Sequence, residues 1–176
     1  MIPLILVFLL VFNPNISAHE DHHTSIENEI GEGRPTSWVQ WIGSFHLIFL
    51  HFPIALINMV TFSELLFAWR EKALFEFSAR FMLLAAAILA LPTALLGLVY
   101  STSASYSGLM ETFLRWHMWC GIATTILSAT LVFVREYFGR CTLYFLGLSV
   151  LFLLVNITGF LGGGISFGPY QMLPPL

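Results

Sequence analysis

Four apolar stretches, each long enough to cross a membrane, constrain this chain more than any other feature. They run approximately over residues 45–69, 79–101, 114–134 and 141–161. A helix needs about 20 mostly apolar residues to span the roughly 30 Å hydrocarbon core of a bilayer. Only 10% of the residues are charged, whereas soluble domains carry about 25%. The sequence therefore predicts an integral membrane protein of the all-α class.

The connections between these stretches are short. Consecutive helices are then expected to be antiparallel neighbours in an up-down four-helix bundle, with the first and third helices diagonal to each other. We assign residues 45–168 to this four-helix transmembrane domain and residues 169–176 to a tail outside the cytoplasm. Lipid is therefore the main predicted partner, and no basic surface indicates nucleic acid.

The first 18 residues have the pattern of a secretory signal peptide, with an apolar run at 2–12 and a plausible cleavage site after Ala18. No Lys or Arg precedes the apolar run, so an uncleaved anchor is the alternative. Residues 19–44 are expected to form an extracytoplasmic segment that is rich in His and acidic residues. Its last part is aromatic, and the spacing of Trp38 and Trp41 suits a short helix in the membrane interface.

Basic residues indicate the orientation of the bundle. Only Arg34 and Arg115 lie on the side of the second connection. The other five flank the first and third connections: Arg70, Lys72, Arg80, Arg135 and Arg140. By the positive-inside rule those two connections face the cytoplasm. We therefore expect a protein of the bacterial cytoplasmic (inner) membrane with both mature termini outside, and we expect Glu64, near the inner end of the first span, to reach water.

Two histidines stand out because ionisable side chains inside a membrane usually mark a functional site. His51 and His117 lie at the outer ends of the first and third spans, which are diagonal partners in the predicted bundle. A stripe of His51, Ala55, Asn58 and Phe62 is expected to face inward, as is one that begins at His117. His46 is five residues from His51, about 140° around a helix, and we place it at the interface instead.

These motifs, in this order, resemble a family of small bacterial membrane proteins known as domain of unknown function 2231. The matching features are H-x4-HFPIAL at 46–56, WHMW at 116–119 and TGFLGGG at 158–164, with a Pro92…Gly97 segment between the first two. The resemblance implies the four-span fold, and relatives in some lineages adjoin or are fused to cytochrome c-like domains. Relatives often read TGHLGG in the last helix, where this chain has Phe160, so no ligand is expected from that position.

The leading functional hypothesis is a membrane-embedded protein that holds a b-type haem, or a similar redox cofactor, and transfers electrons near the outer membrane face. His51 and His117 would be the axial ligands of the iron, because imidazole is a standard haem ligand. Arg115 could bind a haem propionate, since guanidinium suits carboxylates. Cytochrome c-like or other membrane redox subunits would be its partners.

Two alternatives stay open. In the first, the chain is a cofactor-free membrane subunit or assembly factor whose histidines hydrogen-bond across helices. In the second, the chain handles copper or zinc, and His19, His22 and His23 are the metal ligands of a His-rich tail. The spans contain no GxSxG or HExxH motif. We therefore expect an electron-transfer or accessory subunit more than a stand-alone enzyme.

Overall fold

The computed structural model describes residues 37–102 and 105–168. Every regular element in these two ranges is a helix, and four helical stretches are long and apolar enough to cross a membrane. The elements are α2 (Trp38–Ser44), α3 (His46–Phe49), α4 (His51–Arg70), α5 (Ala73–Ser101), α6 (Leu109–Phe138) and α7 (Thr142–Phe167). The predicted all-α class and its four membrane-spanning helices are confirmed; the predicted signal peptide lies outside the described residues.

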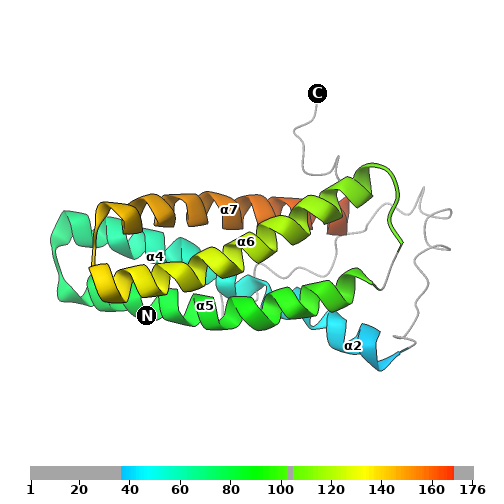
Figure 1. Ribbon diagram of the computed structural model, residues 1–176, viewed down its shortest axis with the longest axis horizontal. Helices are drawn as coiled ribbons and strands as arrows, with labels where there is room; N and C mark the ends of the chain where they lie inside the picture. Colours follow the sequence, from blue (N-terminus) through cyan, green and yellow to red (C-terminus); the bar gives the residue numbers. More distant parts are fainter. Residues whose placement is uncertain (1–36, 103–104, 169–176) are drawn as a thin grey trace, which may run out of the picture. The chain divides into compact units, whose positions relative to one another are not determined.

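The four long helices form an up-down bundle (Figure 1). Helix α4 packs on α5, α5 on α6, α6 on α7 and α7 on α4, whereas no Cα atom of α4 lies within 8 Å of α6 and none of α5 lies within 8 Å of α7. The first and third spans are therefore diagonal, as the short connections predicted. Helices α2 and α3 continue the first span along α5.

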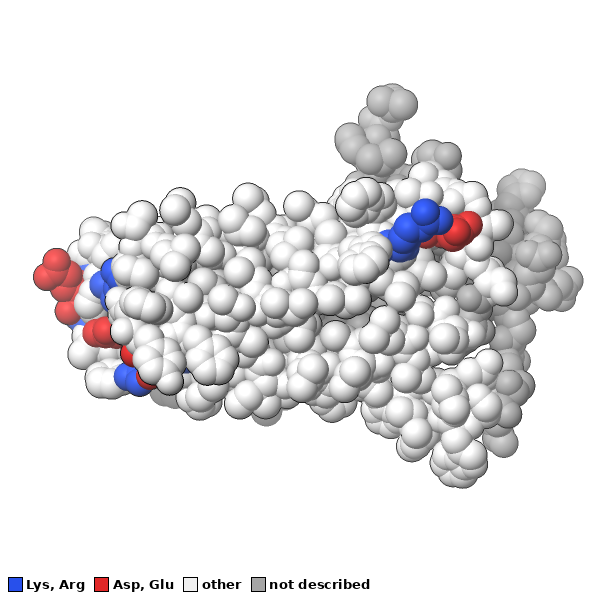
Figure 2. Space-filling view, in the orientation of Figure 1, with Lys and Arg blue, Asp and Glu red and all other residues white. Residues whose placement is uncertain are grey.

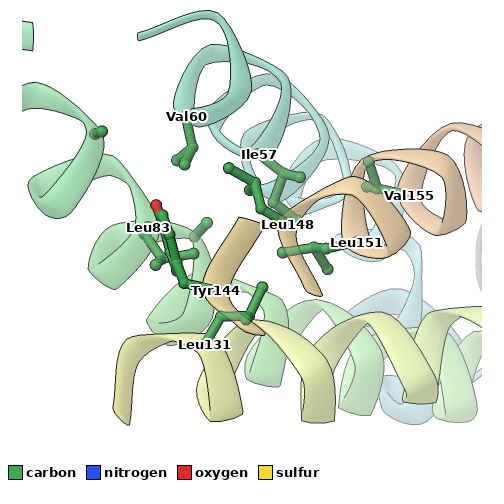
Figure 3. Close-up of a cluster of buried hydrophobic side chains, with 10 residues drawn as sticks. Ile57, Val60, Leu83, Leu131, Tyr144, Leu148, Leu151 and Val155 are labelled. Atoms are coloured by element: carbon green, nitrogen blue, oxygen red, sulfur yellow. The ribbon is translucent and has the colours of Figure 1, made fainter. Parts of the chain in front are cut away.

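Side chains from all four long helices meet in one apolar core (Figure 3). Within α4, the buried positions Pro53, Ile57, Val60 and Glu64 repeat at alternating intervals of four and three residues. This is the spacing of one face of a helix. The inward face of the first span is therefore the one that carries Ile57, and not the one that carries Ala55.

The two ends of the bundle differ in charge, and the surface between them carries almost none (Figure 2). At the end formed by the α4–α5 and α6–α7 connections, the Glu64 carboxylate is 3% exposed. It accepts hydrogen bonds from the hydroxyl of Tyr144 at 2.9 Å and from Nε of Arg140 at 2.9 Å. The expectation that Glu64 reaches water was wrong, because these partners satisfy its charge inside the bundle. We call this end of the bundle, formed by the α4–α5 and α6–α7 connections, the charged end.

Further ion pairs tie the helices together at the charged end. The Arg135 guanidinium, only 7% exposed, donates to Glu76 at 3.0 Å and lies 3.9 Å from Glu64. Arg80 of α5 pairs with Glu136 of α6. Since Glu64 lies on α4 and Tyr144 on α7, the network joins all four long helices.

Candidate cofactor site at the histidine end

At the opposite end of the bundle, the imidazole rings of His46 and His117 meet edge to face. Their centroids are 6.2 Å apart and their planes are inclined at 83°. Nδ1 of His46 lies 2.8 Å from the carbonyl oxygen of Thr93 on α5, and Nδ1 of His117 lies 2.9 Å from that of Thr158 on α7. Each ring is thus oriented by the backbone of a neighbouring helix.

These contacts determine which ring nitrogens remain available. A carbonyl oxygen can only accept, so Nδ1 carries the proton in both neutral imidazoles. Nε2 of each ring then has a free lone pair, and among the described residues neither Nε2 has a hydrogen-bond partner. A histidine that binds a metal through one nitrogen almost always donates its other N–H in this manner.

A proline lies close to the break in the first span, between α3 and α4. Pro53 has no N–H, so the carbonyl of Phe49 loses its helical donor, and the first span is interrupted between α3 and α4. The hydroxyl of Thr93 lies 3.4 Å from that Phe49 carbonyl. Thr93 therefore contacts the interrupted segment twice, through its hydroxyl to Phe49 and through its carbonyl to His46.

Two glycines let the rings lie against the neighbouring backbones. A Cβ atom added at Gly97 of α5 would lie 2.9 Å from Cε1 of His46. A Cβ added at Gly162 of α7 would lie 3.0 Å from Cε1 of His117. Real Cβ atoms essentially never approach a neighbour to 2.9 Å, and 3.0 Å is tighter than most Cβ contacts, so each imidazole would have to shift if its glycine were replaced.

The α6 face beside His117 is less crowded. A Cβ added at Gly121, one turn further along α6, would meet only the methyl group of Thr158, at 3.9 Å. Another turn along, the hydroxyl of Thr124 is buried and has no hydrogen-bond partner within the described part of the chain. Buried polar groups are nearly always paired, and an orphan is often explained by a bound group or water.

The structure does not bring His51 to His117. His51 is exposed on the outer surface of α4, as are Ala55 and Phe62 of the stripe that we expected to face inward. His46, which we placed at the interface, occupies the inward position. Helical spacing explains this, because His46 lies one heptad before the buried Pro53 and so continues its face.

Of the remaining predicted site residues, Arg115 is the one that the structure describes, and it does not contact the histidine pair. Arg115 lies near the outer end of α6, where its exposed guanidinium donates to Glu111 at 2.8 Å. His19, His22 and His23 lie outside the described residues. Among those that are described, there is no group of three or more His, Cys, Asp or Glu residues that could hold a metal ion.

The fold and its hydropathy define an integral membrane protein of the four-helix class. Residues 44–168 match the family model described as "Predicted membrane protein (DUF2231)". The chain belongs to this family, as the H-x4-HFPIAL and TGFLGGG motifs indicated. No curated protein and no solved structure matches the chain.

Proposed function

We propose that this chain is a membrane-embedded b-type haem protein whose axial ligands are His46 and His117. The observation that carries the proposal is the shared orientation of the two rings. Each imidazole donates its Nδ1–H to a backbone carbonyl, at 2.8 and 2.9 Å, and keeps Nε2 free. Two histidines on separate helices with Nε2 free are the ligand set of a six-coordinate b-type haem.

The separation of the rings fits ligation of one iron. Because a metal–imidazole bond is about 2 Å long, two rings on opposite sides of a metal have centroids roughly 6 Å apart. The observed separation is 6.2 Å. Ring pairs without a metal also pack at such distances, so the free Nε2 atoms, and not the distance, favour ligation.

The number of ligands favours haem over a bare metal ion. Zinc sites take three or four protein ligands. The described residues offer only two imidazoles here, without a third metal-binding group. A haem macrocycle would itself supply four nitrogen ligands, so its iron would need only these two imidazoles from the protein. The buried, unpaired hydroxyl of Thr124 would offer a polar contact on the α6 face below His117.

The chain's own residues would then set the position and the coordination of the haem. Thr93 and Thr158 would hold the two ligand rings, and Arg115 would exchange Glu111 for a propionate. The haem supplies one-electron chemistry. At this end of the bundle, which basic-residue counts place near the outer face, a cytochrome c-like subunit would be a suitable electron partner.

Haem titration of the purified protein tests the proposal. The full chain, expressed with ample haem and purified in mild detergent, is expected to show reduced-minus-oxidised bands of a six-coordinate b-type haem. Added hemin should saturate at one per chain. A protein without haem bands, before and after hemin is added, would instead support the cofactor-free membrane subunit.

A further inference from the structure

Two asparagines pair on the lipid-facing surface of the bundle. Nδ2 of Asn156, near the middle of α7, donates to Oδ1 of Asn58 on α4 at 3.1 Å. The side chain of Asn156 is exposed and that of Asn58 is half-buried. The pair therefore lies at the depth of the hydrocarbon core, where no water is available to satisfy amide groups.

The pair leaves one donor and one acceptor unused. A primary amide has two N–H donors and an oxygen acceptor. Asn156 uses its second N–H on the Phe152 carbonyl at 2.7 Å, and Asn58 uses one N–H on the Ile54 carbonyl at 2.8 Å. Within the described residues, Oδ1 of Asn156 and the second N–H of Asn58 have no partner.

This face carries further small and polar residues beside its exposed apolar ones, which include Phe62 and Phe160. His51 is exposed two turns before Asn58 on α4, with the small Ala55 exposed between them. Ser149 is exposed two turns before Asn156 on α7. By contrast, the outward face of α5 is formed by large apolar side chains: Phe81, Leu84, Ile88, Leu91 and Leu95.

We propose that the α4–α7 face, defined by His51, Ala55, Asn58 and Asn156, binds a second copy of this chain. About a two-fold axis, the free N–H of Asn58 in one copy would donate to Oδ1 of Asn156 in its partner, and the reciprocal bond would form by symmetry. A second copy is the occupant that supplies both missing groups at once. Ala55 would let the two α4 helices approach closely. Hydrogen bonds between side-chain amides of neighbouring helices stabilise such contacts.

Cysteine cross-linking in native membranes tests the contact without disturbing the amides. In a full chain with Cys120 and Cys141 changed to Ser, Ala55→Cys should give an oxidant-dependent disulfide dimer. Leu91→Cys, which is exposed on α5, is the matched control and should stay monomeric. Equal yields from both positions, or none from Ala55→Cys, would overturn the proposal.

Asn156→Leu tests the hydrogen bonds themselves. The dissociation constant of the dimer in detergent should rise by roughly tenfold or more, since the two symmetric hydrogen bonds between side-chain amides are lost. Thr130→Val is the control, because this exposed hydroxyl bonds only to the Ile126 carbonyl of its own helix; it should leave the constant unchanged. A change of less than twofold in Asn156→Leu would contradict the proposed contact. Neither result depends on haem.

Discussion

His46 and His117 face each other across a bundle in which the Cα atoms of the diagonal helices α4 and α6 stay more than 8 Å apart. The contact is possible because α3, which precedes α4, lies along α5, and because α5 and α7 each supply a carbonyl that orients one ring. Four helical segments thus converge on two imidazoles. This convergence gives the costly intramembrane histidines a defined geometry.

The close approach of each ring to a glycine predicts the effect of adding one methyl group. Gly97→Ala and Gly162→Ala would place Cβ 2.9 Å and 3.0 Å from the imidazoles. Each should destabilise the protein by about 1–3 kcal/mol, because overpacking outweighs the gain in helix propensity. Unfolding by a denaturing detergent measures this.

Gly159→Ala is the matched control for the glycine variants. Its added Cβ would lie 3.7 Å from Cδ1 of Ile54, an ordinary contact. It should be neutral or stabilise the helix by up to about 1 kcal/mol. If Gly97→Ala and Gly162→Ala proved as stable as Gly159→Ala, the rings would not lie where the structure has them.

The buried carboxylate at the charged end should contribute much of the stability there. Glu64→Gln leaves the guanidinium groups of Arg135 and Arg140 without their shared partner. The expected loss is about 3–5 kcal/mol, as for other buried pairs that lose one member. Tyr144→Phe removes one hydrogen bond to the carboxylate and should cost about 1.5–3 kcal/mol.

Glu111→Gln provides the comparison for Glu64→Gln. Glu111 also pairs with an arginine, but both side chains are more than half exposed, at 55% and 66%. Its loss should change the unfolding free energy by less than about 1 kcal/mol. Equal effects of the two substitutions would mean that Glu64 is accessible to water.

The orientation inferred from basic residues predicts the location of each connection. Alkaline phosphatase fused after residue 168 should be active, and green fluorescent protein fused at the same point should be dark, because that end is expected outside the cytoplasm. Fusions after Phe138 should give the opposite pair of results. The reverse pattern at both fusion points would contradict the predicted topology.

The fold could be predicted because the features that determine it follow one another along the sequence. Long apolar stretches give the spans, and short connections give the order of neighbours. The family match to residues 44–168 agrees with that reading. Which residues face inward was harder to predict, because a membrane helix is apolar on the side that faces lipid as well as on the side that faces the core.

The choice between His46 and His51 shows this difficulty. Small residues after His51 suggested an inward stripe, yet Ala55 faces outward. The better signal was Glu64, an acidic residue that must be satisfied inside the bundle, on one face with Ile57 and Pro53. Extending that face by one heptad reaches His46. The contacts of Glu64 with Arg140 and Tyr144 join residues far apart in sequence, which no local pattern reveals.

The most direct test of the account is the haem spectrum of three single variants of the purified full chain, each titrated with hemin. His46→Ala and His117→Ala should each abolish the six-coordinate spectrum, because each removes one proposed axial ligand. His51→Ala should keep the wild-type spectrum, since its side chain lies exposed on the outer surface of α4. Loss of the spectrum in His51→Ala, with a wild-type spectrum in His46→Ala, would contradict the assignment.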